Sequence, residues 1–177
     1  MSEETEIKTF YHCAMRGGTQ LGLLWIALYA SFVASFVTPV FSLFFLALNI
    51  LSPFYAAYIA NGFRRRECNN TLSYSKAFTF VAIMYMCASL LAAVAHFLYF
   101  QFMDNGFIIQ LLLETSDILK ENGAQFGEFA TEFNKSVEQL ISLGTKGIVF
   151  NILSSNIMNG ILLSAIIAIF VKRNPQQ

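Results

Sequence analysis

The sequence predicts an all-α integral membrane protein: an up-down bundle of four transmembrane helices, with an extracytoplasmic amphipathic helical hairpin between the third and fourth. Only 12% of the 177 residues are charged and 56% are hydrophobic, whereas soluble domains carry about a quarter charged residues. Four runs without Asp, Glu, Lys or Arg are each long enough to cross a bilayer, which takes about 20 residues. These runs leave one long polar interval. We therefore treat residues 1–177 as a single transmembrane domain.

The first two predicted spans form a tight helical hairpin. They cover residues 17–37 and 40–60 and are separated only by Thr38-Pro39. Proline suits the first turn of a helix, because its missing N–H would have no partner there. We therefore expect the two spans to be antiparallel neighbours.

The third and fourth predicted spans cover residues 77–103 and 147–171. The third is long for a perpendicular crossing, so we expect it to tilt or to project from the bilayer. Lys172-Arg173 closes the fourth span.

The polar interval between these two spans carries one apolar stripe with a period of seven residues: Leu112, Leu119, Phe126, Phe133 and Leu140. Such spacing is typical of amphipathic helices. Glycine favours a helix C-terminus, so Asn122-Gly123 predicts two outer helices, at about residues 105–121 and 124–143. The stripe needs cover, either from the outer leaflet or by packing of the helices on each other or on a partner. Helices that lie on a membrane usually have a basic polar face, and this one is acidic, which favours packing.

The basic residues indicate the orientation. Eight of the eleven lysines and arginines lie before the first span, between the second and third, or after the fourth: Lys8, Arg16, Arg64, Arg65, Arg66, Lys76, Lys172 and Arg173. The outer interval holds the other three. Because positive charge stays on the cytoplasmic side, we expect both termini to be cytoplasmic.

The fourth span presents a small and polar face. One row contains Asn151, Ser155 and Asn159, and the neighbouring row contains Asn156, Gly160 and Ser164. Small residues let helix backbones approach, and Asn or Ser side chains can hydrogen-bond across the contact. The face therefore predicts helix packing. A polar permeation path is the alternative, although no charged residue accompanies the rows.

Arg64, Arg65 and Arg66 are candidate contacts for anionic lipid headgroups, although their role in setting topology would be reason enough for them. His96 is the one histidine within a span, where it would either shuttle protons, bind a cofactor or bond to a neighbouring helix. The three cysteines are scattered. No catalytic, cofactor-binding or metal-binding motif is recognisable, so we expect no enzyme and no cofactor. The formal net charge of zero predicts no nucleic-acid partner.

The order of features also resembles a known family. The basic Arg64–Arg66 stretch, the segment from Leu72 to Phe78, and a span that ends in residues 99–104 are similar to a family of four-span bacterial inner-membrane proteins. That family is catalogued only as a domain of unknown function, mainly from one phylum of Gram-negative bacteria. The resemblance implies a four-helix domain in the bacterial inner membrane and no activity.

From these observations we expect a non-enzymatic multi-pass membrane protein. It would be a scaffold or accessory subunit that associates through its helix faces with itself, as a homo-oligomer, or with a membrane enzyme. The alternative is a small transporter or flippase-like carrier of an amphipathic or lipid-linked substrate. Both place the chain in the lipid bilayer.

Overall fold

The computed structural model describes residues 3–121 and 123–173, and the described chain is helical almost throughout. The helices are α1 (Glu3–Ser35), α2 (Val40–Glu67), α3 (Tyr74–Phe102), α4 (Phe107–Glu121) and α5 (Gly123–Val171). Four of them, all except α4, contain a window long and apolar enough to cross a membrane. The prediction of an all-α membrane helical bundle is therefore confirmed.

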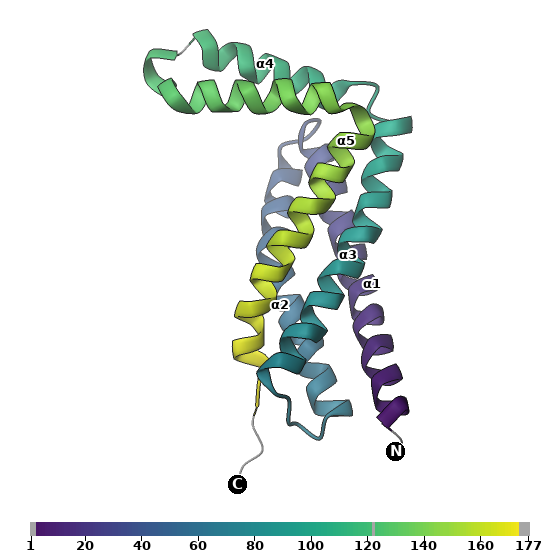
Figure 1. Ribbon diagram of the computed structural model, residues 1–177. Coiled ribbons are helices and arrows are strands. Elements are labelled where there is room, and N and C mark those ends of the chain that lie inside the picture. The colour runs from purple at the N-terminus through teal and green to yellow at the C-terminus, as the bar shows by residue number, and fades with distance from the viewer. Residues whose placement is uncertain (1–2, 122, 174–177) are drawn as a thin grey trace. The chain divides into compact units, whose positions relative to one another are not determined.

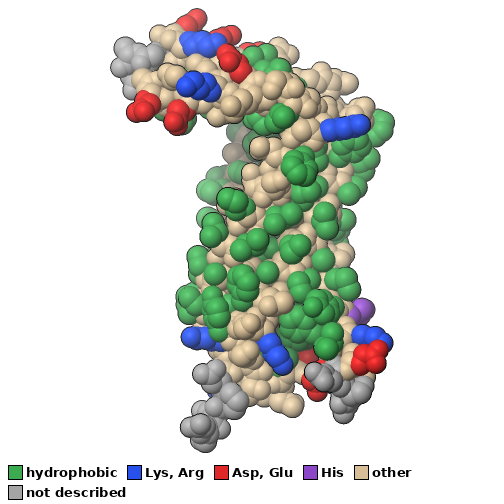
Figure 2. All heavy atoms as spheres, in the orientation of Figure 1, with side chains coloured by type: hydrophobic (Ala, Val, Ile, Leu, Met, Phe, Trp, Pro, Cys, Tyr) green, Lys and Arg blue, Asp and Glu red, His purple; other side chains and the backbone are tan. Residues whose placement is uncertain are grey.

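The chain divides into two compact units, which we describe separately. The bundle unit contains residues 1–92 and 153–177, and the hairpin unit contains residues 93–152. Helices α3 and α5 contribute to both. In the bundle unit, the start of α1, the α2–α3 turn and the end of α5 lie at one end (Figure 1). On the face drawn in Figure 2, hydrophobic side chains cover the helices of this unit and charged side chains gather at that same end.

Helices α1 and α2 form the expected hairpin. The chain turns at Thr38, whose N–H donates to the Ala34 carbonyl at 3.0 Å, and Pro39 starts α2 with helical backbone angles. Further along the hairpin, the Trp25 indole N–H donates to the Ser52 hydroxyl at 2.7 Å. This bond gives both polar groups a partner away from water, where an unpaired group would be costly.

Helix α1 also packs closely on α3, because it has glycine at the contact. A Cβ atom at Gly18 would lie 2.5 Å from the Cys87 Cβ and 2.7 Å from the Met84 carbonyl oxygen. One turn on, a Cβ at Gly22 would lie 2.9 Å from a Leu91 methyl group. At Gly18 no other residue type fits without moving a helix, and at Gly22 a Cβ would require the Leu91 side chain to shift. The absence of a side chain at Gly18 therefore sets the distance between α1 and α3.

The hairpin unit is built by α4 and the first part of α5. Asp104 is buried and its carboxylate accepts a hydrogen bond from the Ile108 N–H at 3.1 Å, which caps the start of α4. The Ser116 hydroxyl bonds to the Asn134 side chain and so joins the two helices. Helix α4 begins two residues after the predicted start at residue 105. The residue expected at the break, Asn122, lies outside the described part of the chain.

The apolar stripe of the hairpin unit is covered in part within the unit itself. Val137 is buried, and four stripe residues are half-buried: Leu112, Leu119, Phe133 and Leu140. The side chain of Phe126, the fifth member, is outside the described set. The helices therefore pack on each other, one of the arrangements that the sequence left open. Within α5 the backbone leaves the helical region at Gly144 (φ 63°, ψ −179°), a conformation that favours glycine, next to the predicted end of the outer helix at residue 143.

Candidate functional site

The candidate site lies at the end of the bundle unit where the predicted cytoplasmic segments meet. Leu72, in the α2–α3 turn, and Arg173, just after α5, exchange two backbone hydrogen bonds of 2.8 Å. Asn69 and Asn70 precede this bridge with positive φ values of 47° and 60°. Asparagine tolerates this conformation better than most residues, so the pair ends α2 and turns the chain toward α5. Segments far apart in the sequence are thus tied together.

Arg64 is a structural part of this end. It is buried, and its guanidinium Nη1 donates to the Val171 carbonyl oxygen at 2.6 Å. That carbonyl belongs to the last turn of α5, where helical acceptors have no partner within the helix. Arg64 therefore caps α5 from α2, and its side chain is not on the lipid-facing surface. Arg65 and Arg66 are exposed, so the predicted lipid contact rests on them.

The sequence contains a signal for this inward position of Arg64 that is absent from the predictions above. Ser52, Ala56, Ala60 and Arg64 follow one another at four-residue steps on α2, and all four are buried. Residues four apart share a helix face. A small-residue row that ends in arginine therefore indicates that this arginine continues the packed face.

Three phenylalanines cluster at this end of the bundle unit and line two cavities. The rings of Phe63 and Phe80 are stacked with centroids 4.2 Å apart, and Phe10 meets each edge-on at 5.6 Å. Such arrangements stabilise a contact beyond the area that it buries. The cluster joins α1, α2 and α3, and Phe63 lines both cavities.

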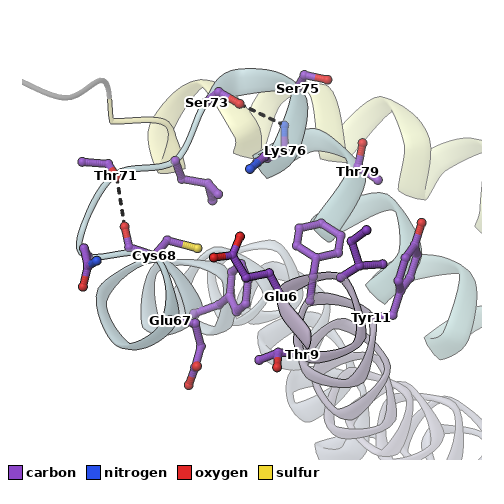
Figure 3. A pocket seen from close by; sticks show the side chains of 15 residues that line it. Glu6, Thr9, Tyr11, Glu67, Cys68, Thr71, Ser73, Ser75, Lys76 and Thr79 are labelled. Carbon is purple, nitrogen blue, oxygen red and sulfur yellow. Dashed lines mark hydrogen bonds between the residues drawn. The ribbon is translucent and has the colours of Figure 1, made fainter. Parts of the chain in front are cut away.

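The larger cavity has a volume of about 770 Å³ and lies between the start of α1, the end of α2 and the α2–α3 turn. Figure 3 shows Glu6 from α1 and Lys76 from α3 pointing into it. Hydroxyl side chains line it as well: Thr9, Thr71, Ser73, Ser75 and Thr79. Cys68 is half-buried at this cavity, and burial raises the pKa of its thiol. The lining offers hydrogen bonds and charges of both signs, which suits a small polar or amphipathic ligand.

The smaller cavity, of about 340 Å³, lies between α1 and α2. Arg16 and Gln20 of α1 line it together with Tyr58 and Arg66 of α2. Neither Arg16 nor Gln20 is among the site residues predicted from the sequence. The signal for them is their place beside the boundary of the first predicted span, because facing hairpin helices bring their boundary residues to the same level.

The predicted packing face of α5 is split by the structure. Gly160 and Ser164 are buried and Asn156 is half-buried. A Cβ at Gly160 would lie 2.7 Å from the Tyr85 Cβ of α3, and the Ser164 hydroxyl donates to the Gly160 carbonyl at 2.6 Å. This row therefore packs inside the same chain.

The neighbouring row, Asn151, Ser155 and Asn159, is exposed. Met158 and Leu162 are 66% and 62% exposed on the same side of α5, so the polar row lies within an apolar surface. We name Asn151, Ser155 and Asn159 the exposed α5 row.

His96 is buried on α3. Within the part of the chain that the structure describes, no group of three or more His, Cys, Asp or Glu side chains could hold a metal ion.

Four long apolar helices, packed in part through small residues, define a multi-pass membrane protein of the helical-bundle class. The chain belongs to the family described as a protein of unknown function, DUF4199, whose model matches residues 17–173. The match includes all four predicted spans and confirms the resemblance to a family catalogued as a domain of unknown function. No curated protein and no solved structure gives a match to the chain.

Proposed function

We propose that this protein is a non-enzymatic scaffold or accessory subunit of the bacterial inner membrane. In this proposal both termini are cytoplasmic, and the protein associates through the exposed α5 row with a second copy or with a membrane enzyme. The observation that carries the proposal is the exposure of Asn151, Ser155 and Asn159 within a charge-free span.

The physical argument is the cost of a polar side chain in lipid. Hydrocarbon offers no hydrogen bonds, so an exposed asparagine amide at this depth has no partner unless another helix supplies one. Interhelical hydrogen bonds in membranes contribute about 0.6 to 2 kcal/mol each. Three polar residues on one face of one helix can therefore stabilise an association by a few kcal/mol. An amide both donates and accepts, so a second copy would complement the row as well as an unrelated helix would.

The test compares neighbouring serines on α5. Ser155 belongs to the exposed α5 row, whereas Ser154 is also exposed but lies about 100° away around the helix. The double variant Ser155→Leu and Asn159→Leu should reduce the assembly to monomers, and Ser154→Leu should leave it unchanged. The mass of the intact particle in mild detergent, measured by native mass spectrometry, gives the readout and also names any partner protein.

Gly160→Leu separates folding from association. Its side chain would collide with Tyr85 of the same chain, so we expect loss of folded protein and not a clean dissociation. If the double variant keeps the mass of the wild-type particle, or if Ser154→Leu dissociates it equally, association through the exposed α5 row is wrong.

A carrier function is the second candidate, and the larger cavity favours it. Its volume of about 770 Å³ lies within the range of small-molecule sites, and Glu6 and Lys76 give it both charges. In liposomes, wild-type protein should then move a labelled lipid or amphiphile across the bilayer, and Lys76→Gln should slow this movement. A flux equal to that of empty vesicles across a broad lipid panel would eliminate this candidate.

A further inference from the structure

The α1–α2 cavity has the features of a headgroup site at a membrane surface, independently of the association through α5. Arg16 directly precedes the first charge-free run, and Arg66 follows the second. Both therefore lie at the level where the hydrocarbon ends and lipid phosphates begin. Tyr55 and Tyr58, deeper on α2, have stacked rings with centroids 6.4 Å apart. Tyrosine is enriched at this depth, because its ring suits the acyl region and its hydroxyl suits the headgroups.

The charge of the cavity is not neutralised by ion pairs within the protein. Among the described residues, the only salt bridges within 4.0 Å are Lys8–Glu4 and Lys120–Asp117. Glu67 lines the cavity together with Arg16 and Arg66. These three side chains give the cavity a formal charge of +1. Arg16 and Arg66, from different helices, thus line one space, and neither forms a salt bridge among the described residues.

We propose that this cavity binds the phosphate of an anionic phospholipid headgroup through Arg16 and Arg66. A guanidinium donates two parallel hydrogen bonds to phosphate oxygens, and such charge-assisted bonds are the strong class. The Gln20 amide can donate to the remaining polar part of the headgroup. A volume of about 340 Å³ holds a headgroup, while the acyl chains run outside along the apolar surfaces of α1 and α2.

The proposal changes the group of arginines expected to contact lipid. Arg64 is used inside the protein, where it holds Val171. Arg65 is exposed but does not line the cavity. Among the three consecutive arginines only Arg66 belongs to the site, and its partner Arg16 comes from the other helix of the hairpin.

The experiment measures lipid adducts by native mass spectrometry of the full chain, titrated with phosphatidylglycerol or phosphatidylcholine in detergent. Wild-type protein should bind phosphatidylglycerol at least about tenfold more tightly than phosphatidylcholine. Arg16→Gln and Arg66→Gln should each raise the Kd for phosphatidylglycerol about tenfold or more. Arg65→Gln removes the same charge from the same segment and is the matched control, for which the Kd should remain as in the wild type.

Three results would overturn the proposal. An equal loss of affinity in Arg65→Gln would mean diffuse charge attraction. Both lipids carry a phosphate and only phosphatidylglycerol has a net negative charge, so equal binding of the two would mean that the site does not select an anionic headgroup. Competition by soluble glycerol phosphate at the concentration of the lipid would mean a site for a free phosphate compound.

Arg16→Lys and Arg66→Lys keep the charge while losing the paired geometry. They should therefore bind phosphatidylglycerol with an affinity between that of the wild type and that of the glutamine variants, and full wild-type affinity would contradict a bidentate contact.

Discussion

Replacing Gly18 with alanine tests the closest helix contact in the bundle unit. The added Cβ would lie 2.5 Å from the Cys87 Cβ and 2.7 Å from the Met84 carbonyl oxygen. Both atoms are fixed by the backbone of α3, so no side-chain rotation relieves the collision. Ordinary carbon contacts begin at about 3.5 Å, which means that α1 and α3 must move apart by about 1 Å.

The matched control for this change is Gly62→Ala on α2. A Cβ at Gly62 meets nothing within 4 Å, so this variant has only the intrinsic advantage of alanine in a helix, about 0.5–1 kcal/mol. Both variants share that advantage, and the difference between them isolates the steric cost. Overpacking costs about 1–3 kcal/mol, and each kcal/mol moves Tm by about 2–4 °C in a chain of this size. Gly18→Ala should therefore melt about 2–12 °C below Gly62→Ala.

Trp25 provides the assay because it is the only tryptophan. Its indole N–H bonds to Ser52 and its ring lies 5.8 Å from that of Tyr85, so it reports on contacts among α1, α2 and α3. Its emission during heating in detergent gives Tm for both variants. Equal melting temperatures, or a higher one for Gly18→Ala, would refute the reasoning about the α1–α3 contact.

Further predictions concern the end of the bundle unit and the hairpin unit. Arg64→Gln should lower stability by about 1–3 kcal/mol, because the buried Val171 carbonyl loses its donor, whereas the same change at the next, exposed arginine should alter Tm by little; equal effects would contradict the capping role. Asp104→Ala should weaken α4 by about 1 kcal/mol through loss of the bond from the Ile108 N–H, seen as faster amide exchange in α4, and unchanged exchange would show that the cap is dispensable. Burial raises the pKa of the Cys68 thiol, so its thiolate fraction at pH 7 is below that of an ordinary cysteine. In a variant that retains only this cysteine, maleimide labelling should be slower than that of free cysteine and should accelerate as pH rises, and labelling as fast as that of free cysteine would contradict the effect of burial.

The four long apolar helices could be predicted from the sequence because local chemistry determines them. A run of apolar residues without charge is enough to define a membrane helix. Positions such as Gly144 mark where a helical pattern ends, since few other residues adopt its backbone conformation. Such signals do not depend on which helix lies next to which.

The division of the α5 face could not be predicted, because it depends on a contact between distant segments. Asn156 and Gly160 follow the same four-residue spacing as Ser155 and Asn159. In a sequence the two rows are equivalent, and only the position of Tyr85 on α3 makes one of them internal. Arg64 is similar in one respect. The row of small residues before it on α2 indicates its inward direction, but nothing in the sequence identifies α5 as the helix that receives its guanidinium.

The contrast between the two α5 rows strengthens the case for association. In the row that packs inside the chain, the Ser164 hydroxyl bonds to the carbonyl of Gly160 in its own helix, so this row is complete without a partner. The exposed α5 row includes two asparagines, Asn151 and Asn159, whose amides are too rich in donors and acceptors to be satisfied by one backbone carbonyl. If lipid alone covered them, leucine at both positions would stabilise the monomer, because the desolvation cost of the amides would disappear. If a helix covers them, the same change should weaken the assembly, so the sign of the effect on the isolated monomer and on the particle mass together identifies what lies against α5.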